Sequence, residues 1–214
     1  MEKDVKEALQ KTKVVAIIRG MAPDVCVRLA KAYQEGGIRL VEVAFSQVGD
    51  SAATVSAIKA IKASCPGMHV GAGTVITDAQ LDMAVEAGAE FVVSPNCSPA
   101  IIRRAAAAGL VTMPGALTPT EAVDAWEAGA SFVKMFPAGS LGPGYVKAIC
   151  APLSHIPFLA VGGISPDNVG DFIRAGCVGA GVGGNLTNKE WIASESWDKI
   201  AETARQLVAN AKCK

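Results

Sequence analysis

A phrase of helix, glycine and short apolar run recurs along this 214-residue chain and limits the folds that it can adopt. Gly88, Gly109 and Gly129 lie 21 and 20 residues apart, each between a helical pattern and an apolar run. Glycine just past a helix supplies the left-handed C′ residue without a Cβ penalty. A helix and a strand fit into about 20 residues only if their connections are short. The repeat therefore predicts compact βα units and a parallel sheet.

Eight strands and seven intervening helices follow from this pattern, with a final helix after the last strand. The strands are expected at 14–18, 40–43, 69–71, 91–94, 110–113, 132–135, 158–161 and 178–182. The helices are expected at 23–35, 51–63, 78–86, 99–108, 119–127, 144–151, 166–175 and 189–211. Thr118 before Pro119, with Glu121 following, is a typical N-terminal cap. The α/β pattern predicts a (β/α)8 TIM barrel with an additional N-terminal helix, as one domain over residues 1–214.

Composition and charge exclude several function classes. Basic and acidic residues number 20 each, and no basic stripe occurs, so we expect no nucleic-acid partner. No apolar run approaches the roughly 18 residues of a membrane span, so no membrane partner is expected. The charged start "MEKDVKEALQKTK" is not a signal peptide, and the six scattered cysteines lack a C-x-x-C, which together predict a cytoplasmic protein with reduced thiols. The two isolated histidines, His69 and His155, are interpreted as structural, and no metal is expected.

Lys134 interrupts the apolar stretch "SFVKMFPAG". A closed parallel barrel has no edge strand and both of its faces are covered, so this lysine cannot lie on a solvated face. Strand side chains alternate, which puts Lys134 and Phe136 on one side and the valine and methionine between them on the other. We expect Lys134 to point into the barrel mouth at the carboxyl ends of the strands, where barrel active sites lie.

Glu42 has the same inward parity in the second strand, "LVEVA", at a strand end expected to be adjacent to that of Lys134. A buried ammonium loses its proton easily and can attack a carbonyl to form a Schiff base. A carboxylate within reach can then move the required protons. Lys134 and Glu42 thus form a minimal aldolase pair; the alternatives are a buried salt bridge between them, or Glu42 acting only as a partner of Lys134 or Arg19.

Two glycine clusters, "AVGGIS" and "GVGGN", end the seventh and eighth strands. In many barrels these loops bind phosphate through backbone N–H groups, which a Cβ would keep at a distance. The candidates are Gly162, Gly163, Gly183, Gly184 and Asn185, with tight-turn geometry as the alternative. A G-x-G-x-x-G run also ends at Gly184, but only 30 residues follow it, so we reject a dinucleotide site.

The motifs "GAGTV", "VSPN", "PGALTPTEA", "FVKMFPAG" and "VGGISPDN", in this order, resemble the class I 2-keto-3-deoxy-6-phosphogluconate and 4-hydroxy-2-oxoglutarate aldolases. The resemblance runs from about residue 15 to 186. It implies Lys134 as the Schiff-base lysine, Glu42 as the proton-transfer residue, and a pyruvate site lined by Thr74, Pro95 and Phe136. It also implies a homotrimer acting on a small keto acid without metal or other cofactor, in carbohydrate metabolism of the Entner–Doudoroff type.

The sequence departs from the family pattern directly after Glu42. In the best-known branch of the family, the second strand continues to an arginine that helps to hold the substrate carboxylate, whereas this chain continues with Phe45, Ser46 and no arginine. Arg19 in "AIIRG" is the candidate replacement, its alternative being a structural ion pair with Glu42. "AIIRG" and "FLAVGG" are more similar to the branch acting on 2-keto-3-deoxy-6-phosphogalactonate, and "GVGGNLT" to gluconate/oxoglutarate proteins, which leaves both epimers open.

Three other functions stay open at this point. A phosphate-binding sugar-phosphate isomerase or epimerase would use Glu42 as a base and form no covalent adduct with pyruvate. A sugar-phosphate binding protein would keep its ligand affinity after Lys134→Ala. A metal-dependent aldolase would lose activity with a chelator, although two isolated histidines make such a metal site hard to build.

Overall fold

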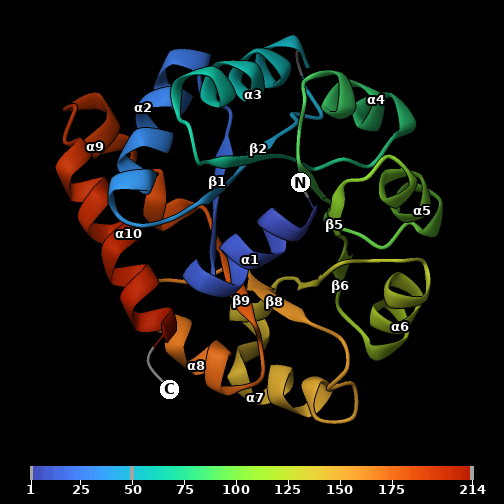
Figure 1. The fold of residues 1–214 in the computed structure, drawn as a ribbon. Coiled ribbons are helices and arrows are strands. Elements are labelled where there is room, and N and C mark those ends of the chain that lie inside the picture. Colours follow the sequence, from blue (N-terminus) through green and yellow to red (C-terminus); the bar gives the residue numbers. More distant parts are fainter. Residues whose placement is uncertain (1, 49–50, 213–214) are drawn as a thin grey trace.

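The computed structural model describes residues 2–48 and 51–212 and has a parallel β-barrel at its centre (Figure 1). The strands pair in the order β5-β4-β3-β2-β1-β9-β8-β7-β6, and every pairing is parallel. Helices surround the barrel on its outside (Figure 1). The predicted fold class is therefore confirmed.

The strand positions agree with the predicted ones to within two residues at each end. The strands are β1 (Val14–Arg19), β2 (Leu40–Ala44), β3 (His69–Gly73), β4 (Phe91–Val93), β5 (Val111–Met113), β6 (Gly115–Ala116), β7 (Val133–Met135), β8 (Phe158–Val161) and β9 (Gly179–Val182). The helices between and around them are α1 (Glu2–Thr12), α2 (Pro23–Glu35), α3 (Ala52–Ser64), α4 (Asp78–Glu86), α5 (Pro99–Ala107), α6 (Pro119–Glu127), α7 (Ala138–Cys150), α8 (Val169–Arg174), α9 (Lys189–Ala193) and α10 (Trp197–Lys212).

Pro114 explains why nine strands are found where eight were predicted. It separates β5 from β6 and has no N–H to donate, so the sheet ladder is interrupted there. β5 pairs with β4 on one side, and β6 pairs with β7 on the other. The two segments act as one fifth strand, and through it the chain closes the barrel.

Three helix predictions were wrong in their extent. The final helix predicted at 189–211 is two helices, α9 and α10, because the backbone between them turns at Glu195, whose φ is +53°. The helix predicted at 144–151 begins at Ala138 instead, with a kink at Gly142, where φ is +80°. The helix predicted at 166–175 begins at Val169, after a turn in which the Asn168 side chain accepts from the Ser165 N–H.

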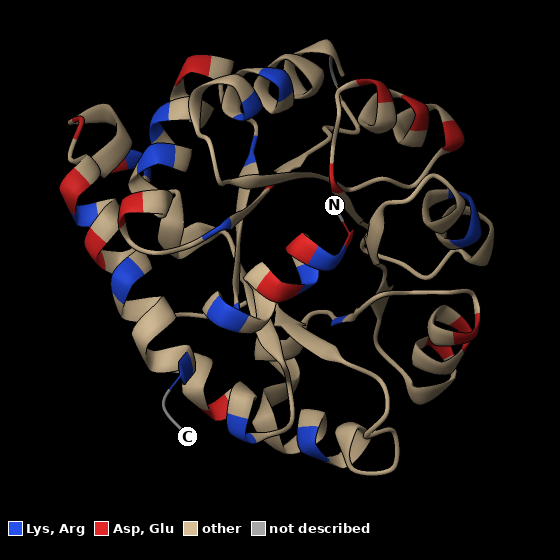
Figure 2. Cartoon of the chain, in the orientation of Figure 1, with Lys and Arg blue, Asp and Glu red and all other residues tan. Residues whose placement is uncertain are grey.

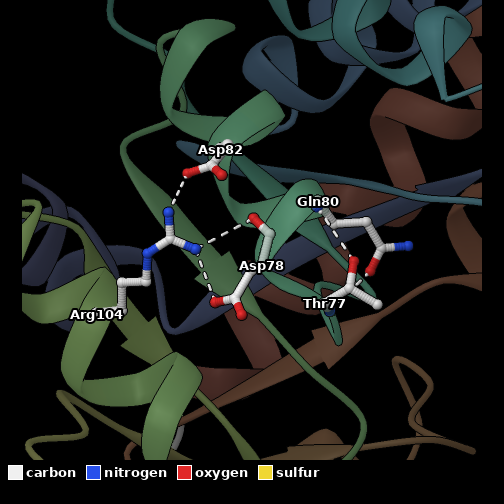
Figure 3. Close-up of polar contacts among 5 residues, drawn as sticks. All are labelled: Thr77, Asp78, Gln80, Asp82 and Arg104. Carbon is white, nitrogen blue, oxygen red and sulfur yellow. Dashed lines mark hydrogen bonds and ion pairs between the residues drawn. The ribbon is translucent and has the colours of Figure 1, made fainter.

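Side-chain caps fix the starts of two helices. Thr118 and Glu121 form the predicted capping box at α6. A second box, Thr77 with Gln80, starts α4 (Figure 3). Arg104 of α5 pairs with Asp78 at 2.7 Å and also with Asp82, which ties α4 to α5 (Figure 3). Caps of this type satisfy N–H groups that the helix itself cannot pair.

The apolar core has two parts, one inside the barrel and one between the barrel and its helices. The inner cluster includes Val15, Leu40 and Phe91, and it also contains Val5 and Leu9 of α1. α1 therefore closes the amino-terminal end of the barrel, across whose centre it lies in Figure 1. The outer cluster takes the alternate strand residues. The carboxyl ends of the strands stay open for a site.

Charged side chains of both signs lie mainly on the surrounding helices, with acidic α4 and α6 on either side of basic α5 (Figure 2). None of the described helices has the length and apolar character needed to span a bilayer.

Candidate active site

Lys134 lies in the middle of β7 and points into the barrel, as alternation predicted. Its neighbours Val133 and Met135 belong to the outer core, while Phe132 belongs to the inner one. Only 7% of the Lys134 surface is exposed. Its Nζ atom lies 4.8 Å from the centre of the Phe136 ring. The amine is thus held at the bottom of an apolar-walled site, where an ammonium is poorly solvated.

Glu42 lies on β2 and is even more deeply buried, with 2% of its surface exposed. Gly73 at the end of β3 makes room for it, because a Cβ on Gly73 would lie 1.7 Å from the Glu42 Oε1 atom. No other residue type could stand at position 73 without displacing this carboxylate. The prediction that Glu42 and Lys134 lie at adjacent strand ends was wrong, since β2 and β7 are separated by β1, β9 and β8. The two side chains face each other across the barrel.

Among the described residues, no ion pair within 4.0 Å joins Lys134 to Glu42. Burial lowers the pKa of Lys134; the Glu42 charge opposes this shift and Arg19 adds to it. Burial raises the pKa of Glu42, and the charges of Lys134 and Arg19 only partly offset that effect. Each group is therefore shifted toward its neutral form, which gives a nucleophilic amine and a carboxyl group able to carry a proton.

Arg19 stays in β1, paired in register with Ala44, and keeps its inward direction despite the turn at Gly20. Its Nη2 atom donates to the Thr74 hydroxyl at 3.3 Å and not to Glu42, so the ion-pair alternative for Arg19 is not observed. Thr74 has a φ of +56°, a conformation that is unfavourable for a β-branched residue. Strain of this kind concentrates at functional sites, where surrounding contacts hold it.

A cavity of about 400 Å³ opens at the carboxyl ends of the strands and contains all of the predicted site residues. Those residues are Arg19, Glu42, Thr74, Pro95, Lys134, Phe136, Gly162, Gly163, Gly183, Gly184 and Asn185. Its volume lies in the range that suits a small metabolite. The amine and the carboxyl group lie in its buried part, while Gly163, Gly184 and Asn185 are exposed at its rim.

In the glycine loops after β8 and β9, carbonyl groups accept hydrogen bonds from the protein while some N–H groups have no acceptor among the described residues. The carbonyl of Gly162 accepts from the Gly139 N–H at 2.8 Å, and that of Gly163 from the Asn168 side chain at 2.9 Å. The Gly183 carbonyl accepts from the Leu186 N–H at 2.8 Å. Within the described ranges, the N–H groups of Gly163 and Gly184 find no such partner. The loops therefore have spare donors and few spare acceptors, an arrangement that suits an anion.

Asn185 lines the cavity, and its side chain bonds to the protein. Its Nδ2 atom donates to the Ile164 carbonyl at 2.9 Å and so links the loop after β9 to the loop after β8. The side-chain amide is therefore committed to the protein, while the Asn185 backbone remains at the rim. Gly162 and Gly163 have φ values of +90° and +73°, so tight-turn geometry accounts for glycine at these two positions.

Four residues beyond the predicted set also line the cavity, namely Ile17, Val161, Ile164 and Gly181. Alternation could have identified two of them. Ile17 shares its parity with Arg19, and Val161 directly precedes the first glycine pair. Ile164 and Gly181 follow from loop geometry and the strand pairing, which sequence alone does not provide.

No group of three or more metal-ligating side chains is found in the part of the chain that the structure describes. His69 bonds to Glu90 at 2.7 Å and His155 packs edge-on against Trp126, which agrees with structural roles for both. The cysteines at 26, 65, 97, 150 and 177 are free thiols, while Cys213 lies outside the described residues.

The sequence pattern of the KDPG and KHG aldolase family matches residues 5–203. The chain belongs to this family. It is 38% identical over 200 residues to the 2-dehydro-3-deoxy-6-phosphogalactonate aldolase of Escherichia coli K12, covering 92% of this chain and 94% of that protein. It is 33% identical over 203 residues to the 2-dehydro-3-deoxy-phosphogluconate aldolase of Treponema pallidum, covering 94% of this chain and 95% of that protein. This member of the family is accordingly a lyase of the aldolase type.

Solved structures of family members share the barrel described above. One described as "Native KDPGal structure" has a TM-score of 0.81 at 37% identity, covering 92% of this chain and 93% of that one. The KDPG aldolase of Legionella pneumophila, with pyruvate captured as a covalent carbinolamine intermediate, has a TM-score of 0.83 at 26% identity, covering 94% and 96%. These relatives support a class I aldolase and do not favour the isomerase alternative.

Proposed function

We propose that this aldolase reversibly cleaves a 2-keto-3-deoxy-6-phospho sugar acid to pyruvate and glyceraldehyde 3-phosphate through a Schiff base on Lys134. The observation that carries the proposal is the buried amine facing a buried carboxyl group across one cavity, with no ion pair between them. A structural pair would be in contact, because uncompensated buried charges are costly. A gap between the two groups instead provides room for a substrate carbon chain.

In the cleavage direction, the neutral Lys134 amine attacks the C2 carbonyl to give a carbinolamine, which loses water to form an iminium ion. Glu42, directly or through one water, removes the proton of the C4 hydroxyl. The C3–C4 bond then breaks, its electron pair forms the enamine, and the aldehyde departs. Protonation of C3 regenerates the iminium ion, and water hydrolyses it to pyruvate and free Lys134.

Arg19 replaces the missing family arginine as the cation for the substrate carboxylate. It lies at the cavity mouth, near enough to bond the Thr74 hydroxyl, and a carboxylate there could accept from both side chains. Pro95 and Phe136 form apolar walls around the pyruvate part. The 6-phosphoryl group would lie at the rim against Gly162, Gly163, Gly183, Gly184 and the Asn185 backbone, where the spare N–H donors are.

The galactonate epimer is the substrate that we propose first. Its support is the 38% identity to the 2-dehydro-3-deoxy-6-phosphogalactonate aldolase of Escherichia coli, compared with 33% identity to the 2-dehydro-3-deoxy-phosphogluconate aldolase of Treponema pallidum. Cleavage of the gluconate epimer, and of 4-hydroxy-2-oxoglutarate to pyruvate and glyoxylate, are the secondary activities to be compared. We expect kcat/KM to be highest for a phosphorylated acid. A higher value for 4-hydroxy-2-oxoglutarate would overturn the phosphate assignment of the glycine loops.

Borohydride reduction in the presence of pyruvate, followed by peptide mapping, tests the covalent step. The peptide containing Lys134 should gain the mass of the reduced pyruvate adduct, and Lys134→Arg should gain none. An active protein whose Lys134 peptide stays unmodified would overturn the Schiff-base mechanism. Chelator treatment should leave activity unchanged, which separates this mechanism from a metal-dependent aldolase.

We also propose a cytoplasmic homotrimer formed by one catalytic domain over residues 1–214, with no nucleic-acid or membrane partner. The trimer is implied by the family resemblance, and Ile76 and Leu117, each more than a third exposed, are apolar side chains that subunit contacts would cover. The free thiols agree with a reducing compartment. Light scattering coupled to size-exclusion chromatography should give three times the chain mass of 21.9 kDa.

A further inference from the structure

Tyr33 is a fully buried tyrosine on α2, outside the cavity and on the helix side of the barrel. Its hydroxyl donates to the Leu186 carbonyl at 2.9 Å. Within the described chain, no second donor reaches that carbonyl. A buried tyrosine hydroxyl needs a partner, and a buried carbonyl needs a donor, so each group satisfies the other.

Leu186 is the last residue of the short 3-10 turn Gly184–Leu186, which carries two of the cavity-lining residues, Gly184 and Asn185. The turn is held from the side by the Asn185 bond to Ile164. Tyr33 holds it from below, through Leu186. A shift of Leu186 would therefore move the exposed N–H groups of Gly184 and Asn185, although Tyr33 itself touches no part of the cavity.

We infer that Tyr33 is a positioning residue for phosphoryl binding, acting through the Leu186 carbonyl on the glycine loop after β9. The inference rests on the proposed function, since it assumes that this loop receives the 6-phosphoryl group. Tyr33 has no contact with Lys134 or Glu42, so its hydroxyl acts on the phosphoryl end of the substrate and not on the chemistry.

Tyr33→Phe tests the inference, because it removes one hydroxyl and keeps the buried ring. The chain also offers a control: Tyr145 donates to the Leu117 carbonyl at 2.6 Å in an exposed bond, and neither Tyr145 nor Leu117 lines the cavity. For Tyr33→Phe, we expect KM for the phosphorylated keto acid to rise about threefold to tenfold with kcat nearly unchanged, the range set by the loss of one buried hydrogen bond. Tyr145→Phe should leave both constants at the wild-type values.

Two probes separate positioning from a general loss of structure. The inhibition constant of inorganic phosphate should rise together with KM in Tyr33→Phe, while kcat/KM for 4-hydroxy-2-oxoglutarate should stay at the wild-type value. An equal loss for both substrates, or no change for the phosphorylated one, overturns the inference. If the wild type itself shows neither inhibition by phosphate nor preference for the phosphorylated acid, the phosphate assignment fails, and that result is visible without any variant.

Native-state hydrogen exchange provides a second measurement that does not depend on activity. The segment 183–187 should exchange faster in Tyr33→Phe than in the wild type, and segments around β7 should not. Unchanged exchange at 183–187 would overturn the positioning role even if the KM values had shifted.

Discussion

Two glutamates at opposite ends of the barrel, the half-buried Glu90 and the buried Glu42, differ in their polar contacts. Glu90, just before β4 at the amino-terminal end, bonds His69 at 2.7 Å and Lys62 at 3.2 Å. Burial alone would raise its pKa, but the bonds to His69 and Lys62 lower it below 4.5. Glu42, at the other end, has no such ion-pair partner among the described residues, and burial raises its pKa above 4.5.

The difference agrees with the proposed roles, in which Glu90 contributes to stability at one end and Glu42 to the chemistry at the other. A carboxylate that is paired on folding stabilises the native state, and one that is desolvated without a contact destabilises it. A carboxylate at position 42 therefore does not increase the stability of the folded protein. A buried carboxyl group with a raised pKa and no ion-pair partner is suited to moving protons between a substrate and the solvent.

The largest expected effect comes from removing Lys134, the proposed nucleophile, which faces Glu42 across the cavity. Lys134→Arg keeps a positive charge but provides no amine able to form a Schiff base. We expect kcat to fall to below roughly one thousandth of the wild-type value. The steady-state cleavage rate, read from pyruvate release, measures this. Lys147→Arg on exposed α7 is the matched control and should be fully active, and substantial turnover by Lys134→Arg would argue for a non-covalent mechanism.

Glu42→Gln tests the difference between the two glutamates, because it should lower the catalytic rate and raise the stability. We expect kcat to fall about a hundredfold to ten-thousandfold, as for loss of a general acid–base group. The melting temperature at pH 7 should rise, because the folded-state pKa of Glu42 is raised and its ionisation therefore opposes folding above about pH 4.5. A lower melting temperature would show that Glu42 is a stabilising partner of Lys134.

Gly73→Ala tests the position of Glu42 without changing its chemistry. The new Cβ would overlap the Glu42 Oε1 atom, so the carboxylate must move. We expect kcat to fall about tenfold to a hundredfold, since displacements of about 1 Å can have that effect. Borohydride trapping at Lys134 should still succeed. Gly144→Ala, where a Cβ meets no atom within 4 Å, is the control that should keep wild-type kinetics.

The smallest effect on catalysis is expected at the other glutamate. Glu90→Gln should leave kcat and KM unchanged and lower the free energy of unfolding by about 1–2 kcal/mol. Because the folded-state pKa of Glu90 is depressed, its contribution is complete above about pH 4.5 and is lost as the pH falls through the folded value. Denaturant titrations of wild type and variant should therefore converge in acid, and a gap that persists there would contradict the assignment.

The sequence predicted the eight-strand barrel and eleven of the fifteen residues that line the cavity. Both predictions depend on local regularities of the sequence. Strand alternation placed Lys134, Glu42 and Arg19 inward, and the repeat spacing fixed the topology. The predicted fold already places Glu42 on the second strand and Lys134 on the sixth, which lie on opposite sides of an eight-strand barrel, so the adjacency prediction conflicted with the predicted fold itself. The interruption at Pro114 also has a local cause, the missing proline N–H. The break before α10 at Glu195 and the bond from the Asn185 side chain to the Ile164 carbonyl depend on tertiary structure, which the sequence pattern does not provide.

The apolar side chains that fill the barrel, with α1 beneath them, make the site a cup that opens at one end only. Substrate enters, and both products leave, through one opening. Lys134 lies in the depth of the cup and the glycine loops at its rim, so the phosphorylated aldehyde lies between the bound pyruvate unit and the solvent. Release should then be ordered, with the aldehyde leaving before hydrolysis frees pyruvate. In the synthetic direction the same order runs backwards, and pyruvate must load first.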